Sequence, residues 1–382
     1  MLSNTTLDSI ETPALLLDEA LLRTNITRMS DHMRQLGVAL RPHVKTAKCL
    51  QVAALCDDGR KGPITVSTLR EADEFAAAGY RDILYAVGYT PNKAAHVRRL
   101  LGQGVTLSVI VDNVAAARAL ALGMADLAEP LRVSIEVDTD GQRAGLRPDD
   151  PALLDVAAAL GAPGLQLAGV LTHCGGAYHC HGAAALVALA EQERAGAVHA
   201  AERLRQAGYP APEVSVGSTP TALFADQLSG VTEVRAGVYV FMDLMMAALG
   251  VCQPEDIAVS VLTSVVGHRR DQGWTLVDAG WMALSRDRGL ADEFVDQGYG
   301  LVCDAQGRVL SDYIVTAANQ EHGIVAHRSG DAARLLDLPV GSMLRILPNH
   351  ACATAAQHAA YQVLAASAPG CLGPVWPRFG GW

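Results

Sequence analysis

The stretch "GVALRPHVKTAKCLQVAALC" (residues 37–56) decides how the chain is interpreted. Its first half predicts a strand over residues 38–44, and its second half has the pattern of a helix. Lys45 follows the strand directly. In α/β barrel enzymes the loops after the strands carry the reacting groups, which makes this lysine a candidate for chemistry. A solvated loop lysine is the alternative, and the rest of the chain has to decide between the two.

Apolar, β-branched segments alternate with helical patterns along the first two thirds of the chain. Seven further segments predict strands, at residues 64–69, 82–87, 107–112, 132–138, 165–173, 213–217 and 233–241. Eight strands, each followed by a helix or a loop, favour a (β/α)8 TIM barrel of the α/β class. An open doubly wound sheet usually has fewer strands, and no G-x-G-x-x-G motif follows the first strand.

The pattern changes after about residue 245, where strand-like segments follow one another without helices between them. This pattern predicts a smaller, mainly antiparallel β domain. We therefore expect the barrel over residues 17–245 and the β domain over residues 246–382. The segment "TPALLLD" (12–18) precedes the first predicted helix, so residues 1–16 are expected to pack with the β domain.

Composition narrows the classes of function. The chain has 382 residues and a formal net charge of −10, which argues against nucleic acid and anionic membranes as partners. No run of about twenty apolar residues occurs, and the start "MLSNTTLDSIETP" lacks the basic and apolar regions of a signal peptide. The eight cysteines lack the short, regular spacings of a disulfide framework. We expect a cytoplasmic protein with reduced thiols that acts on a small molecule.

The residues at the predicted strand ends form an informative set, because the active site of such a barrel lies there. Lys45 ends the first strand, Arg143 follows the fifth, and His173 ends the sixth. Small residues with hydroxyl groups in "GSTPT" (217–221) and "RAGVY" (235–239) predict a phosphate site, although "GST" before a helix can equally be an N-cap. A lysine facing a phosphate-bearing ring suggests a Schiff base with pyridoxal 5'-phosphate.

Six motifs carry a resemblance to a known family: "RPHVKTAK", "DTDGQRAG", "GSTPT", "TEVRAGVYVFMD", "VDAG" and "PNHAC". Together they resemble the fold-type III pyridoxal-phosphate enzymes of the D-serine dehydratase and D-threonine aldolase group. The resemblance covers nearly the whole chain and implies an alanine-racemase-like barrel followed by a β domain. Within the group, "VSTLREA", "NQEHGI" and "PNHACAT" are most similar to the D-threo-3-hydroxyaspartate dehydratases.

The resemblance implies a role for each matching residue. Lys45 would be the Schiff-base lysine and the base at Cα, Arg143 would hydrogen-bond the phenolic oxygen of the cofactor, and His173 would pack beside the ring. The remaining cofactor contacts would be Ser218, Thr219, Gly237 and Val238 at the phosphate, with Tyr178 and Tyr239 lining the pocket. In the alanine racemases an arginine similar in place to Arg235 contacts the pyridine nitrogen, whereas other relatives differ there.

A candidate metal site lies near the C-terminus. His350 and Cys352 are two residues apart, so in an extended segment both would point to the same side. Alone, the pattern is more often a buried cysteine beside an exposed histidine, but the resemblance implies a divalent-metal pair here. Imidazole with thiolate favours zinc, with manganese or magnesium as alternatives. The segment "THCGGAYHCH" (172–181) is a rival cluster, but its His173 is already assigned to the cofactor.

The resemblance implies a dehydratase for D-3-hydroxy amino acids that converts D-threo-3-hydroxyaspartate to oxaloacetate and ammonia, and also acts on D-serine. The alternative is aldolase-type cleavage to glycine and an aldehyde, although the aldolases more often carry His-x-Asp at the metal position. A racemase would need a second base, commonly a tyrosine, and "DAGWMALSRD" (278–287) contains none. A non-catalytic cofactor carrier would lack the β domain.

Two further expectations concern binding. A second substrate carboxylate would need a basic partner, for which Arg286, Arg288 and His322 are candidates, with solvated loop charges as the alternative. Analogy with the fold-type III enzymes implies a homodimer.

Overall fold

The computed structural model describes residues 7–292, 294–367 and 371–382. The chain forms two compact units, one of residues 28–237 with 380–382 and the other of residues 1–27 with 238–379. The boundary near the N-terminus falls inside helix α1 (Glu19–Gln35). The division predicted from the sequence, into residues 17–245 and 246–382, stays a prediction.

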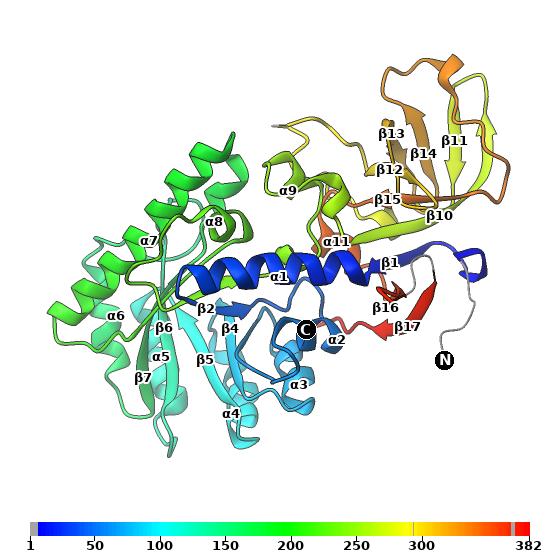
Figure 1. Ribbon diagram of the computed structural model, residues 1–382. Coiled ribbons are helices and arrows are strands. Elements are labelled where there is room, and N and C mark those ends of the chain that lie inside the picture. Colours follow the sequence, from blue (N-terminus) through cyan, green and yellow to red (C-terminus); the bar gives the residue numbers. More distant parts are fainter. Residues whose placement is uncertain (1–6, 293, 368–370) are drawn as a thin grey trace. The chain divides into compact units, whose positions relative to one another are not determined.

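The first unit is the predicted (β/α)8 barrel, which the structure confirms (Figure 1). Eight parallel strands follow the order β2-β9-β8-β7-β6-β5-β4-β3. They are β2 (Ala39–Pro42), β3 (Ile64–Val66), β4 (Asp82–Gly88), β5 (Thr106–Val111), β6 (Leu131–Val137), β7 (Leu165–Thr172), β8 (Glu213–Val216) and β9 (Glu233–Ala236). A parallel bridge between His43 and Thr65 closes the ring of strands. His43 lies two residues before Lys45.

Helices connect the barrel strands, as the sequence pattern predicts (Figure 1). They are α2 (Leu50–Cys56), α3 (Leu69–Ala77), α4 (Ala94–Gly102), α5 (Val114–Met124), α6 (Ala152–Leu160), α7 (Ala183–Gln206) and α8 (Thr219–Phe224). Side-chain caps fix several of their starts: Thr68 caps α3 and Asn113 caps α5, each by accepting a backbone N–H of the first turn. The helices therefore begin close behind the ends of the strands.

Several predicted strands are shorter in the structure, and the difference is largest for the one predicted over residues 233–241. The apolar run over residues 233–241 predicts a single strand, but β9 ends at Ala236. The backbone N–H of Phe241 donates to the carbonyl of Val238, three residues earlier, so that Val238–Val240 forms the 3-10 turn η4. Local hydrogen bonds of this kind replace the pairing that a longer strand would need.

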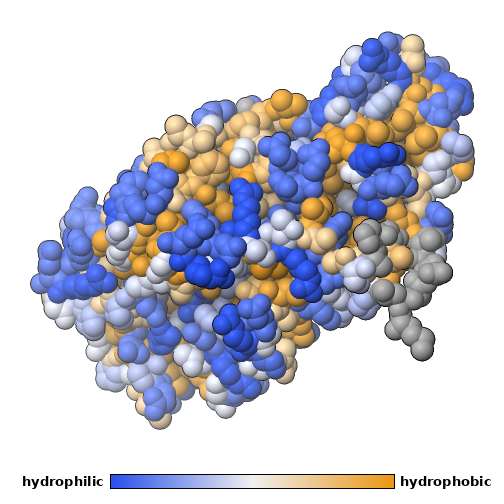
Figure 2. All heavy atoms as spheres, in the orientation of Figure 1, coloured by the Kyte–Doolittle hydropathy of each residue, from blue (hydrophilic) through white to orange (hydrophobic). Residues whose placement is uncertain are grey.

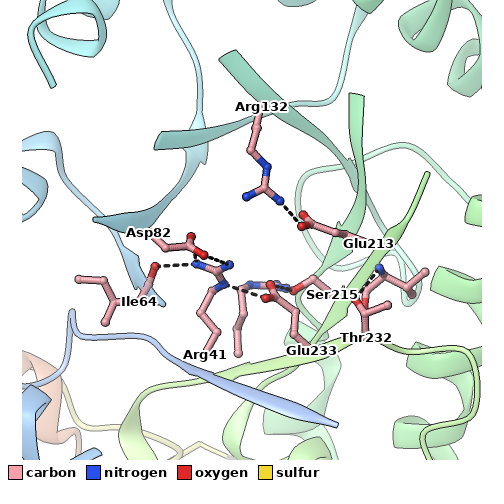
Figure 3. A network of polar contacts seen from close by, with 10 residues as sticks. Arg41, Ile64, Asp82, Arg132, Glu213, Ser215, Thr232 and Glu233 are labelled. Carbon is pink, nitrogen blue, oxygen red and sulfur yellow. Dashed lines mark hydrogen bonds and ion pairs between the residues drawn. The ribbon is translucent and has the colours of Figure 1, made fainter. Parts of the chain in front are cut away.

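Ion pairs fill the barrel where its strands begin (Figure 3). Arg41 of β2 donates from Nε to Glu233 Oε2 and from Nη1 to Asp82 Oδ1, at 2.8 Å in both cases. Ser215 donates its hydroxyl to Glu233 Oε1 at 2.6 Å and contacts Arg235. Most barrels of this type have branched apolar side chains inside. Here the buried charges are paired with each other, which buried charges require.

The second unit contains a nine-stranded sheet in the order β11-β14-β13-β12-β15-β10-β1-β16-β17. The strands are β1 (Ala14–Asp18), β10 (Val259–Arg269), β11 (Trp274–Val277), β12 (Leu301–Asp304), β13 (Val309–Ala318), β14 (Gly323–His327), β15 (Met343–Leu347), β16 (Ala360–Leu364) and β17 (Leu372–Pro377). Strand β1 pairs antiparallel with β10 and parallel with β16. Leu15, Leu16 and Leu17 of this strand are buried, so β1 is a central part of the core.

Three short helices belong to the same unit: α9 (Leu244–Ala248), α10 (Trp281–Leu284) and α11 (Ala351–Ala355). The eight cysteines of the chain are free thiols. Hydrophilic and hydrophobic residues are mixed over the face drawn in Figure 2. Among the described residues, no helix combines the length and the apolar character needed to cross a membrane.

Candidate active site

Lys45 lies half-buried at the carboxyl end of β2. A second lysine in the same loop, Lys48, forms an ion pair with Glu71 Oε1 at 3.1 Å. Glu71 is 1% exposed and also accepts hydrogen bonds from the backbone N–H and the hydroxyl of Ser67. Lys45 has no ion-pair partner within the described part of the chain. The charge of Lys48 is therefore neutralised by Glu71, whereas the amine of Lys45 is available to react.

His173 ends β7 as a neutral imidazole. Burial, together with the charges of Lys45 and Arg143, lowers the pKa of His173 to about 3. Its Nδ1 lies 3.0 Å from the carbonyl oxygen of Gly217, so Nδ1 carries the proton and donates it to that oxygen. The ring is thus fixed in one tautomer between the ends of β7 and β8.

His43 is a second neutral imidazole at this end of the barrel. Burial lowers its pKa well below the usual value, and the nearby charges of Lys45 and Arg235 act in the same direction. The two imidazoles thus lie among three cationic side chains, those of Lys45, Arg143 and Arg235. An environment of this charge favours an anionic ligand.

Two glycines allow the strand ends to approach each other closely. A Cβ on Gly217, whose φ is +135°, would lie 2.2 Å from the carbonyl oxygen of Arg235. A Cβ on Gly237 would lie 2.8 Å from the carbonyl oxygen of His43. Both contacts are too short for any side chain. The ends of β8 and β9 therefore pack against each other and against the loop that carries Lys45.

The N-cap alternative for "GST" holds in the structure. Ser218 caps α8 by accepting a hydrogen bond from the backbone N–H of Thr221, and a capping box completes the turn. Ser218 and Thr219 are both buried. The predicted phosphate contacts of Ser218, Thr219, Gly237 and Val238 stay predictions. The hydroxyl of Ser218 is engaged in the cap of α8.

The other predicted cofactor residues lie in loops. Arg143 is exposed in the loop after β6, and Tyr178 is half-buried in the turn η3 (Gly175–His179) after β7. Val238 and Tyr239 are buried in η4 and belong to the second compact unit. The structure thus brings Lys45, His173 and Arg143 to one end of the barrel, together with the ends of β8 and β9.

The predicted metal pair lies at the start of α11, in the second unit. His350 is the residue before the helix, with extended backbone, and Cys352 is in the first helical turn. The expectation of an extended segment is therefore wrong for Cys352. The two side chains nevertheless lie within hydrogen-bonding reach of each other. No group of three or more His, Cys, Asp or Glu side chains gathers as a metal site in the part of the chain that is described.

Two aspartates hold this loop in place. Asp287 Oδ2 lies 2.6 Å from Nδ1 of His350, a carboxylate–histidine arrangement that fixes the ring and leaves Nε2 for a metal ion. Asp243 is 1% exposed and accepts the backbone N–H groups of Ala351 and Met246, each at 2.9 Å. Although burial lowers the pKa of His350, its hydrogen bonds to Asp287 and Cys352 raise that pKa to about 11.

The rival cluster at residues 172–181 is occupied by other contacts. Cys174 donates its thiol to Asp140 Oδ2 at 3.1 Å, and the backbone N–H of Gly176 donates to the same oxygen at 2.6 Å. Burial raises the pKa of the Cys174 thiol far above its usual value, which disfavours the thiolate that a metal ion needs.

Among the basic residues considered for a second carboxylate, Arg288 is paired with Asp296. The guanidinium of Arg286 lies 4.2 Å from the ring centroid of Trp281 and has no acidic partner within the described ranges. His322 is exposed.

Sequence reasoning missed His43, Glu193, Asp243 and Asp287. His43 precedes Lys45 by two residues and could have been noticed as a neighbour on the same side of the strand. Glu193 falls on the buried stripe of α7, between Ala190 and Ala197, where an apolar residue is expected. Asp243 caps α9 by accepting the backbone N–H of Met246, a local pattern that could have been noticed, but its contact with Ala351 is distant in the chain. Asp287 gave no local signal, because its partner His350 is distant.

Comparisons with known proteins identify the family to which this fold belongs. The model of the alanine racemase N-terminal domain matches residues 17–245, and that of a serine dehydratase domain matches residues 258–364. The chain belongs to this family of alanine-racemase-like proteins. It is 53% identical over 380 residues, 99% of each chain, to D-threo-3-hydroxyaspartate dehydratase of Delftia sp. HT23.

Solved structures and more distant relatives agree with this family assignment. The structure of the Delftia enzyme has a TM-score of 0.95, covering 99% of this chain and 100% of that one. Structures of two variants of D-threo-3-hydroxyaspartate dehydratase match equally well. In one variant a histidine is replaced by alanine. In the other, which is in the metal-free form, a cysteine two positions later is replaced by alanine. D-serine dehydratase of Dictyostelium discoideum is 30% identical over 95% of each chain. D-threonine aldolase of an Arthrobacter species is 31% identical over 89% of this chain and 86% of that one.

The low pKa of His173 has a consequence for stability. Above about pH 6.5 the ring is neutral in both the folded and the unfolded chain. As the pH falls from there towards 3, the unfolded chain binds a proton that the folded protein does not, so the free energy of unfolding falls, by at most about 1.4 kcal/mol per pH unit for one proton. We predict that His173→Asn, whose amide can still donate to Gly217, lowers the slope of the urea midpoint between about pH 6 and 4.

Equal slopes for wild type and His173→Asn would show that His173 titrates normally.

Proposed function

We propose that the chain is a pyridoxal-phosphate- and divalent-metal-dependent dehydratase that converts D-threo-3-hydroxyaspartate to oxaloacetate and ammonia. One observation carries the proposal: a lysine at the end of the first barrel strand, without an ion-pair partner among the described residues, occurs in the same chain as a His350–Cys352 pair backed by Asp287. Identity of 53% along the whole chain with an enzyme of this activity supports the substrate. A cytoplasmic location and a homodimer remain predictions.

The barrel residues fit pyridoxal phosphate. Lys45 would hold it, and the cationic surroundings of His43 and His173 suit its negative charge. Gly217 and Gly237 let the ends of β8 and β9 pack closely against each other and against the Lys45 loop. Ser218 and Thr219, directly after Gly217, would bind the phosphate. When bound, the cofactor withdraws electrons from Cα of the attached amino acid and so makes its proton acidic.

Each residue of the barrel then has one task. The amine of Lys45 takes the proton from Cα as a general base. Arg143 places a positive charge beside the phenolic oxygen. The neutral ring of His173, held by the carbonyl oxygen of Gly217, packs beside the cofactor without adding a charge of its own. Arg235 stays anchored through the carbonyl oxygen of Thr172, at 2.6 Å, and the hydroxyl of Ser215.

The residues of α11 fit a divalent ion. His350 would bind it through Nε2, because Asp287 occupies Nδ1, and Cys352 would bind it as a thiolate. This donor set favours zinc over manganese or magnesium. A metal ion in this place supplies a Lewis acid for the β-hydroxyl group of the substrate. Arg286 is next to Asp287 in the sequence and has no acidic partner among the residues that the structure describes; it would bind the second carboxylate.

We predict that borohydride reduction of the yellow protein fixes the cofactor on Lys45 and not on Lys48, because the ion pair with Glu71 engages Lys48. Peptide mapping by mass spectrometry locates the label. The Lys45→Ala variant should carry none. A label on Lys48, or a colourless protein that does not take up the cofactor, would refute the assignment.

We predict that the protein releases oxaloacetate and ammonia from D-threo-3-hydroxyaspartate in equal amounts. Removing the metal with a chelator, or replacing Cys352 by alanine, should lower kcat at least about 100-fold, since a Lewis acid contributes several kcal/mol. Zinc should restore the chelated wild type but not Cys352→Ala, and the variant should still bind the cofactor.

The matched control is Cys371→Ala, a half-buried free cysteine of the same unit, which should keep wild-type turnover. Glycine and glyoxylate as the main products would favour the aldolase alternative. Full turnover by rigorously metal-free protein would make the pair structural.

We predict that Arg286→Gln raises KM for D-threo-3-hydroxyaspartate about tenfold, the scale of one charge-assisted contact, and leaves KM for D-serine within about twofold. D-serine lacks the second carboxylate, so it reports on the rest of the site. Arg288→Gln, whose charge is already paired with Asp296, should change neither value. Equal losses for both substrates would remove Arg286 from substrate recognition.

A further inference from the structure

Two neighbouring residues of α7 contact the ends of three consecutive barrel strands. Gln192 donates from Nε2 to the carbonyl oxygen of Thr139, two residues after β6, at 2.7 Å. Glu193 Oε1 accepts the backbone N–H of Cys174, two residues after β7, and that of Gly217, directly after β8, both at 3.1 Å. One helical turn thus holds the loops that lead to Arg143, His173 and Ser218.

Glu193 is the central residue of this arrangement. Its side chain is 2% exposed. The loop that it contacts after β8 leads into the cap of α8, where the hydroxyl oxygen of Thr221 accepts the backbone N–H of Ser218 at 3.2 Å. The carboxylate therefore fixes the β8 loop at Gly217, directly before that cap.

The position of Glu193 would ordinarily be apolar. It lies on the stripe of α7 formed by Leu186, Ala190, Ala197 and Leu204, all buried against the barrel. A carboxylate in such a place loses its hydration and is stabilised only by the hydrogen bonds it accepts. Gly196 brings this part of the helix close to the β6 loop, since a Cβ there would lie 2.8 Å from Cγ2 of Thr139. This part of α7 therefore binds the loops through hydrogen bonds, where an ordinary buried stripe would only pack apolar side chains.

We propose that Glu193 is a positioning residue, which sets the backbone of Gly217 and the ring of His173 so that the β8 loop can bind the phosphate group of the cofactor. The inference rests on the proposed function, because it takes pyridoxal phosphate as the ligand. The carbonyl of Gly217 holds His173 while the N–H of the same residue is held by Glu193. Loss of the carboxylate therefore releases both groups together.

The test compares Glu193→Leu with Glu193→Gln and with the control Glu191→Leu, an exposed glutamate on the same helix. Two quantities are measured: hydrogen exchange of the cofactor-free protein, and the dissociation constants for pyridoxal phosphate and for pyridoxal, which lacks the phosphate. Leucine cannot accept the two N–H groups, whereas the carbonyl oxygen of glutamine can.

In Glu193→Leu we expect faster exchange in peptides covering residues 173–177 and 214–219 and not elsewhere in the barrel. Affinity for pyridoxal phosphate should fall at least about tenfold, while that for pyridoxal changes less than about twofold. Glu193→Gln should recover most of the affinity, and Glu191→Leu should match the wild type.

Wild-type exchange and affinity in Glu193→Leu would overturn the proposal, as would equal losses for the two ligands, which indicate general destabilisation. If Glu193→Leu does not fold, Glu193→Ala tests the same link, since it removes the acceptor of the two N–H groups without adding bulk; an unchanged ratio of the two affinities would overturn the proposal. A wild type that binds no pyridoxal phosphate refutes the proposed function instead, while the exchange data still test whether Glu193 holds the loops.

Discussion

A buried carboxylate that accepts backbone N–H groups is the interaction on which the described site depends. Glu193 contacts the loops after β7 and β8 at once, and these loops carry His173, Gly217 and Ser218. Loops at strand ends have N–H groups that no neighbouring strand pairs, and buried N–H groups need an acceptor. A charged acceptor on a rigid helix satisfies them and fixes the loops in a single conformation.

The same kind of interaction recurs elsewhere in each of the two units. Glu71 holds Lys48 and Ser67 beside the loop of Lys45, and Asp243 holds the backbone between His350 and Cys352. In each case a buried acid fixes the backbone while the reactive group projects from it. Ion pairs close the other end of the barrel (Figure 3), so the chain separates the charges that stabilise the fold from those assigned to chemistry.

The sequence was sufficient for the barrel, because continuous apolar strands alternating with helices admit few other folds. It was also sufficient for the position of Lys45 after a strand, because that position is local information. It was insufficient for contacts between distant residues. Glu193 and Gly217 are separated by 24 positions, and Asp287 and His350 by 63. Periodicity marks Glu193 as unusual but cannot name its partners. The strand predicted over 233–241 failed for a related reason, since a turn formed by local hydrogen bonds has the same apolar composition as a strand.

The most direct test of the whole account is a crystal structure of the protein with cofactor and metal bound, with anomalous data collected at the zinc edge. The account predicts continuous density from Nζ of Lys45 to the cofactor, with its phosphate at Gly217–Thr219. It also predicts an anomalous peak bonded to Nε2 of His350 and to Sγ of Cys352. A cofactor attached to another residue, or a metal ion bound away from this pair, would contradict it.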